Sequence, residues 1–77
     1  MQIFVGNLSN MTTANHLANL FLPFGIVQTS TIISGRNTGR SLGIGYIEME
    51  PNCGKRAIQK LNRLLFMNSY IEVTEVD

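Results

Sequence analysis

Apolar and polar positions recur along the chain with two different periods, one typical of strands and one typical of helices. Residues 2–8, QIFVGNL, alternate with period two, which puts Ile3 and Val5 on one face of a strand and Gln2 and Phe4 on the other. This segment ends at a turn-prone Gly-Asn pair. The first element is therefore predicted to be a strand with one apolar face.

The next segment has the longer period of an amphipathic helix. Thr13 is the expected N-cap of this helix, and Pro23 with Gly25 is expected to end it. Apolar side chains recur there at intervals of three and four residues, at Leu17, Leu20, Phe21 and Phe24.

Three further strands and a second helix follow. β-Branched residues favour a strand over 27–33, and a polar turn over 34–39 separates it from an alternating segment at 42–49. The second helix begins near Pro51, and residues 70–76 alternate again as the last strand. Helical spacing in the second helix is kept by Gly54, Ala57, Ile58 and Leu61.

The order βαββαβ predicts an α+β fold, the ferredoxin-like sandwich. In this layout two helices cover one face of a four-stranded antiparallel sheet, and the other face stays open. Alternation assigns Phe4 to the open face, and the glycines at 43 and 45 to the helix side. The open face is also expected to carry Leu42, Ile44, Tyr46, Glu48, Tyr70, Glu72 and Thr74.

Composition limits the function classes. The 77 residues fit one domain over 1–77, and a net charge of +1 makes bulk attraction to nucleic acid weak. Cys53 is the only cysteine, so an internal disulfide is excluded, and His16 has no second histidine beside it for a metal site. The sequence contains no apolar run long enough to span a bilayer and no secretory signal pattern, which favours a cytoplasmic protein. No catalytic pair is evident, so we expect neither an enzyme nor a bound cofactor or metal.

Two segments carry a family resemblance. Residues 3–8, IFVGNL, resemble the six-residue motif on the first strand of RNA recognition motifs, and residues 42–49, LGIGYIEM, resemble the eight-residue motif on their third strand. Residues 37–41 resemble the turn before that strand. The helices match in type and spacing, so the resemblance covers essentially the whole chain. It is closest in form to small stand-alone RNA-binding proteins of bacterial type.

The resemblance implies binding of single-stranded RNA, in which flat side chains on the open sheet stack on unpaired bases. Phe4 and Tyr46 occupy the positions of the family's two main stacking rings. Ile44 stands at the place of a third ring and Leu42 at a usually basic place, so a modest affinity is expected. The implied RNA-binding residues are Phe4, Tyr46, Ile44, Arg40, Arg36, Gln2, Tyr70 and Thr74.

A second function class uses the same face. Large exposed apolar patches mark partner surfaces, so the open face is alternatively a protein-interaction module or the contact of a weak homodimer. The basic residues on or near the second helix are expected to form a solvated surface on the side opposite the open sheet. The apolar face would consist of Phe4, Ile33, Leu42, Ile44, Tyr46 and Tyr70, and the solvated surface of Lys55, Arg56, Lys60 and Arg63.

Overall fold

The computed structural model describes residues 1–76, which form two helices and a four-stranded antiparallel sheet. The ferredoxin-like βαββαβ order predicted from the sequence is confirmed. The main elements are β1 (Gln2–Gly6), α1 (Ala14–Phe21), β2 (Val27–Ser34), β3 (Ser41–Met49), α2 (Pro51–Leu61) and β6 (Glu72–Val76). A short 3-10 helix, η1 (Leu22–Phe24), and a small hairpin, β4 (Leu65–Phe66) with β5 (Ser69–Tyr70), complete the fold.

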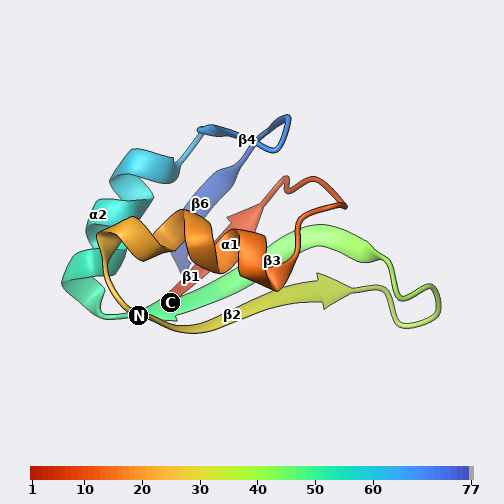
Figure 1. The fold of residues 1–77 in the computed structure, drawn as a ribbon, viewed down its shortest axis with the longest axis horizontal. Coiled ribbons are helices and arrows are strands. Elements are labelled where there is room, and N and C mark those ends of the chain that lie inside the picture. Colours follow the sequence, from red (N-terminus) through yellow and green to blue (C-terminus); the bar gives the residue numbers. More distant parts are fainter. Residues whose placement is uncertain (77) are drawn as a thin grey trace.

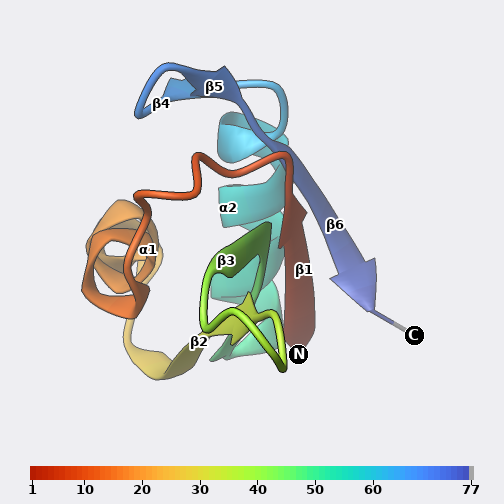
Figure 2. The same ribbon diagram turned by 90° about the vertical axis from the view of Figure 1, so that its right-hand side faces the viewer.

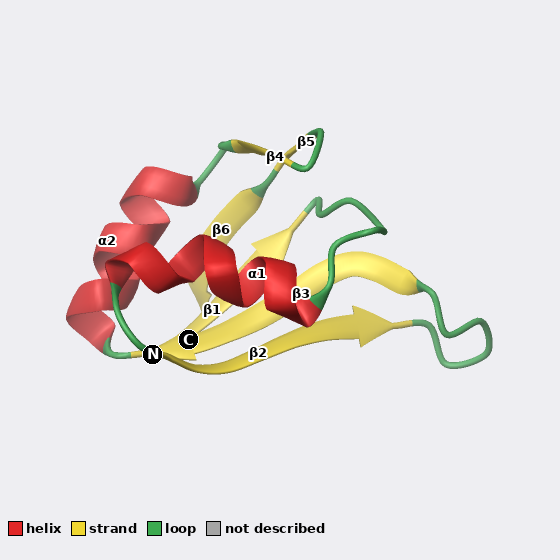
Figure 3. Ribbon diagram, in the orientation of Figure 1, coloured by secondary structure: helices red, strands yellow, loops and turns green. Residues whose placement is uncertain are grey.

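The strands lie in the order β2-β3-β1-β6, so β1 and β3 are central and β2 and β6 form the edges. Figures 1 and 3 show α1 and α2 lying across one side of this sheet. Turned by 90°, the molecule shows both helices on the same side of β1 and β6 (Figure 2). Within residues 1–76, no helix or strand covers the opposite face.

The core fills the layer between the helices and the sheet. Ile3 and Val5 of β1 are fully buried there, as the alternation predicts. Gly45 leaves no room for a side chain, because a Cβ at this position would lie 2.7 Å from the backbone oxygen of Thr31 and 2.9 Å from Cδ2 of Leu17. The buried apolar residues are Ile3, Val5, Leu8, Leu17, Phe21, Ile47, Met49, Ala57, Leu61, Ile71 and Val73.

Side-chain caps set the start of α1. Thr13 Oγ1 accepts a hydrogen bond from the backbone N–H of His16 at 3.1 Å, and His16 Nδ1 accepts one from the backbone N–H of Thr13 at 3.1 Å. This is a capping box in which a histidine stands where glutamate is usual. The predicted N-cap is confirmed, and His16 therefore has a structural role.

The second helix has its own cap and a close contact with β1. Glu50 is the N-cap of α2, and its carboxylate accepts a hydrogen bond from the backbone N–H of Cys53 at 3.0 Å. Glycine costs a helix about 1 kcal/mol relative to alanine. At Gly54 the absence of a side chain lets the sulfur of Met1 pack against the helix, because a Cβ there would meet that sulfur and lie 3.3 Å from Cδ1 of Ile3.

The prediction of one strand over residues 70–76 was wrong at its start. Tyr70 belongs to β5, which pairs with β4 in a separate two-stranded hairpin. Met67 and Asn68 form its turn with φ values of 47° and 69°, as a two-residue hairpin turn of type I′ requires. The third strand begins at Ser41, one residue earlier than expected, and the first strand ends at Gly6.

Candidate nucleic-acid interface

Phe4 lies at the centre of the open face. Its neighbours across the sheet are Tyr46 on β3 and Thr74 on β6. The ring centroids of Phe4 and Tyr46 are 5.8 Å apart, and the ring planes are inclined by 66° in an edge-to-face arrangement. Each ring is half-buried. The two rings therefore lie side by side on the face away from the helices, as the alternation predicts.

Polar side chains continue the row that contains these rings. Thr31 on β2 is opposite Tyr46, so the row across the sheet reads Thr31, Tyr46, Phe4, Thr74. Thr31 and Thr74 are exposed. The rings are thus flanked on both sides by hydroxyl groups that can donate or accept hydrogen bonds.

The neighbouring row is more polar. Gln2 lies between Glu48 on β3 and Val76 on β6, and Thr29 lies opposite Glu48. Gln2 and Glu48 are exposed. Glu72 lies opposite Gly6 on the other side of the Phe4 row. The open face therefore combines two rings with a carboxylate on each side, which disfavours phosphate directly beside the rings.

The glycines of β3 determine how far this regular surface extends. Gly43 has a φ of 76°, and a Cβ there would come within 2.9 Å of the Leu8 carbonyl oxygen. The pairing of β2 with β3 also shifts between Ile32 and Ser34. Strict alternation of side chains ends at this irregularity. The strand register therefore assigns Tyr46 to the open face but does not determine the face on which Leu42 lies. Leu42 is 60% exposed.

Two of the implied arginines lie in one loop. Arg36 and Arg40 belong to the connection between β2 and β3, which projects beyond the sheet (Figure 1). The loop is closed by hydrogen bonds from the Gly35 N–H to the Arg40 carbonyl at 2.7 Å and from the Gly39 N–H to the Gly35 carbonyl at 2.9 Å. Both arginines are exposed. Their charges thus lie at the end of the sheet rather than beside Phe4.

Tyr70 lies outside the row of the main sheet. Its ring is 65% exposed, and its backbone carbonyl accepts a hydrogen bond from Nδ2 of Asn7 at 2.8 Å. Asn7 has a φ of 55°, a conformation that asparagine tolerates well. The six-residue motif therefore contributes the ring of Phe4 and, through Asn7, a hydrogen bond to the hairpin that carries the exposed ring of Tyr70.

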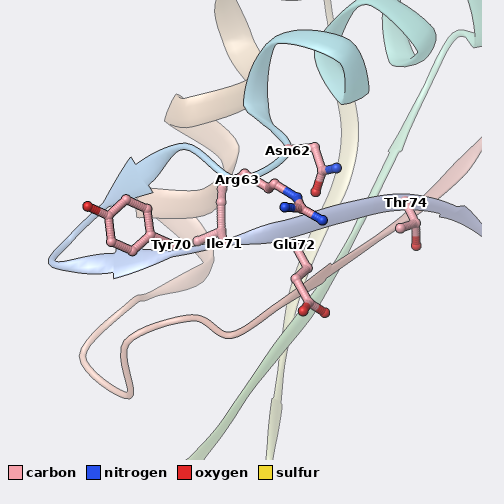
Figure 4. Close-up of a pocket in the computed structure, with 6 residues that line it drawn as sticks. All are labelled: Asn62, Arg63, Tyr70, Ile71, Glu72 and Thr74. Atoms are coloured by element: carbon pink, nitrogen blue, oxygen red, sulfur yellow. The ribbon is translucent and has the colours of Figure 1, made fainter.

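Arg63 was expected, with the other basic residues on or near the second helix, to form a solvated surface, and its side chain is exposed. It follows α2 and lines a hollow beside β6 together with Thr74, which is on the open face (Figure 4). Its backbone has a φ of 69°, and its N–H donates a hydrogen bond to the Ile71 carbonyl, which brings the end of α2 next to the start of β6. Periodicity gave no signal for this placement, because it depends on one backbone conformation after the helix.

Neither a metal-binding cluster nor a membrane-spanning helix is found in the described part of the chain. Within residues 1–76, no group of three or more His, Cys, Asp or Glu side chains is arranged to hold a metal ion. No helix among these residues is long and apolar enough to cross a membrane.

Comparison with known proteins identifies the family of this fold and surface. Residues 3–72 match the sequence model of the RNA recognition motif. The RNA-binding protein RbpE of Nostoc sp. is 36% identical over 76 residues, which cover 97% of this chain and 77% of that protein.

Solved structures give the same result. The crystal structure of the RNA-binding protein PG1 superposes with a TM-score of 0.96 at 36% identity, covering 99% of this chain and 93% of that one. A Sex-lethal protein–RNA complex superposes with a TM-score of 0.92 at 26% identity, and the match covers 99% of this chain and 46% of that longer chain.

Proposed function

Because the chain belongs to the RNA recognition motif family, we propose that it binds single-stranded RNA by stacking bases on Phe4 and Tyr46. The single observation that carries the proposal is the adjacency of these two rings, 5.8 Å apart on a face that no helix covers. Unpaired bases lose their stacking partners, and exposed aromatic rings replace them. Stacking on one ring contributes about 1–3 kcal/mol per base.

The inclination of the rings determines how bases would be arranged. Rings at 66° to each other do not offer one continuous plane. Two bases on Phe4 and Tyr46 are therefore splayed apart rather than stacked on each other, which exposes their edges to the sheet. Thr74 and Gln2 lie next to Phe4 on this face and supply the hydrogen-bonding groups. The projecting loop supplies Arg36 and Arg40 for phosphates.

Affinity is expected to be modest, and catalysis is not part of the proposal. Ile44 offers no aromatic ring at the place where relatives of this family carry a third one. Glu48 and Glu72 bring negative charge to the rows beside Phe4. Two stacking rings still supply about 2–6 kcal/mol before the cost of ordering the RNA strand is subtracted.

Self-association through the same face is the second candidate, and the structure weakens it. The apolar set expected from the sequence does not form one surface, because Tyr70 lies in the separate hairpin β4–β5. Phe4, Ile44 and Ile33 are only partly exposed. Leu42, at 60% exposed, is the one strongly exposed aliphatic side chain of the set. A weak homodimer remains an expectation. It can be tested by comparing the oligomeric state of Leu42→Lys with that of the parent protein by sedimentation.

Titration of single-stranded RNA oligonucleotides, read by fluorescence anisotropy, tests the proposal. Tyr46→Ala should weaken binding by about 1–3 kcal/mol, or roughly 5- to 150-fold, and Phe4→Ala by a similar amount. Lys60→Gln serves as a control, because it removes a charge from α2 on the far side of the sheet. Equal affinity for Tyr46→Ala and the parent would refute stacking. Loss of a dimer with Leu42→Lys, while RNA binding of Tyr46→Ala is unchanged, would favour the interaction module.

A further inference from the structure

A hollow of about 650 Å³ lies beside the free edge of β6, where the row of stacking residues ends (Figure 4). Thr74 lies at one end of it and is the register partner of Phe4. Tyr70 lies at the other end, and Arg63 and Glu72 lie between them. The volume is within the range of sites for small ligands, and it is large enough for one nucleotide. The hollow thus extends from Thr74 on the open face to Tyr70 on the β4–β5 hairpin.

The guanidinium of Arg63 is placed for an anion. Figure 4 shows its side chain running from the end of α2 along β6 toward Thr74. Within residues 1–76, the Arg63 side chain takes part in no hydrogen bond, so its five N–H donors are available to a ligand. Guanidinium groups match phosphate oxygens in a two-pronged geometry.

The backbone around Arg63 is fixed. Its N–H donates to the Ile71 carbonyl at 2.7 Å, although its φ of 69° is one that glycine or asparagine adopts more readily. Asn62, the preceding residue, accepts a hydrogen bond from the Val73 N–H at 3.0 Å and so binds the end of α2 to β6. The backbone at Asn62 and Arg63 is therefore held beside the start of β6.

We propose that this hollow takes the nucleotide next to the one stacked on Phe4. The phosphodiester between the two nucleotides binds the Arg63 guanidinium, and the second base reaches the exposed Tyr70 ring. Glu72 does not favour a further phosphate there, but its carboxylate can accept a hydrogen bond from a base N–H. The inference rests on the proposed function, and it extends the bound strand around the edge of β6.

Oligonucleotides of two lengths test the path. A single-stranded RNA dinucleotide occupies Phe4 and Tyr46 only, whereas a hexanucleotide also reaches the hollow. Arg63→Gln should weaken the binding of the hexanucleotide by roughly 3- to 10-fold. It should also reduce the magnitude of the logarithmic salt slope of this binding by about 0.7. The dinucleotide should bind as it does to the parent protein. Tyr70→Ala should likewise weaken the binding of the hexanucleotide and leave the binding of the dinucleotide unchanged.

Lys60→Gln is the matched control, because Lys60 is an exposed cation three residues earlier that does not line the hollow. If Arg63→Gln and Lys60→Gln bind the hexanucleotide equally well, the inference is overturned. Tyr46→Ala separates this result from failure of the proposed function. If Tyr46→Ala weakens the binding of both oligonucleotides while Arg63→Gln weakens the binding of neither, the stacking proposal is supported and only the proposed path along β6 is wrong. Thermal melts of each variant check that the fold is kept.

Discussion

The ring of Phe4 lies over Gly6, two residues further along the same strand. A Cβ at position 6 would come within 2.8 Å of the ring's Cε2 and 3.1 Å of its Cζ. Gly6 is itself buried. Since its φ is not in the left-handed region, the position of the Phe4 ring, and not the backbone conformation, favours glycine here. The motif residues Phe4 and Gly6 thus act as a pair.

Gly6→Ala should therefore change RNA binding more than stability. The Phe4 ring is the outer end of its side chain and can rotate away from a new methyl group, so the free energy of unfolding should change little. The displaced ring should lose part of its stacking contribution of about 1–3 kcal/mol. In a double-mutant cycle, Gly6→Ala should have no further effect once Phe4→Ala is present. Additive effects of the two substitutions on RNA affinity would contradict the pairing.

The strands and helices of the main fold could be predicted because each has one clear period and one buried face. Ile3, Ile47 and Leu17 are all fully buried where alternation or helical spacing places them. The same alternation put Phe4 and Tyr46 together on the open face, and the register confirms this. Local pattern was sufficient there, since a one-residue slip would have moved an entire apolar set to solvent.

The β4–β5 hairpin and the position of Arg63 could not be predicted in this way. Two-residue hairpin turns are usually signalled by Asn-Gly or Asp-Gly, whereas this turn uses Met67 and Asn68. The chain reversal at Arg63 has no glycine to mark it. Both features depend on long-range hydrogen bonds, such as the one from Asn7 to the Tyr70 carbonyl. A pattern along the sequence does not report contacts of this kind.

Ile44→Phe should tighten RNA binding. Position 44 is half-buried on β3, two residues before Tyr46, and the resemblance to the eight-residue motif places an aromatic ring there. A phenylalanine would add a third stacking surface, with an expected gain of about 1 kcal/mol, or roughly 5-fold in affinity. Ile44→Leu is the control, because it keeps an aliphatic side chain with no π-face. Anisotropy titrations compare the three proteins, and an equal gain for both substitutions would show that bulk rather than stacking is responsible.

Acid should weaken the start of α2. Hydrogen bonds from the backbone N–H groups of Asn52 and Cys53 hold the pKa of Glu50 below its ordinary value of 4.5. A lowered pKa in the folded state means that ionised Glu50 stabilises the fold above the pH at which it ionises in the unfolded chain. This contribution is lost as the pH falls through the lowered value.

Thermal melts across a pH series check this role of Glu50. Glu50→Ala should melt at a lower temperature than the parent at neutral pH, and the difference should shrink below about pH 4.5. Glu50→Asp keeps a carboxylate at the N-cap and should retain the pH dependence. A difference between Glu50→Ala and the parent that stays constant down to strong acid would contradict the prediction.

The salt dependence of RNA binding should be shallow. The net charge is only +1, and Arg36, Arg40 and Arg63 are the cations that the structure offers for phosphates. Each neutralised phosphate of a single strand contributes a logarithmic slope of about −0.7, so three contacts give about −2. Arg36→Gln and Arg40→Gln should each reduce the magnitude of the slope by about 0.7, whereas Lys60→Gln should leave it unchanged. Anisotropy titrations with a hexanucleotide over a series of salt concentrations measure these slopes.

Stacking is nearly independent of salt. Tyr46→Ala should therefore lower the RNA affinity at every salt concentration and keep the salt slope of the parent protein. A slope of about −6 or steeper for the parent protein would mean that a larger basic surface binds the RNA. Stacking on Phe4 and Tyr46 would then not be the main source of affinity.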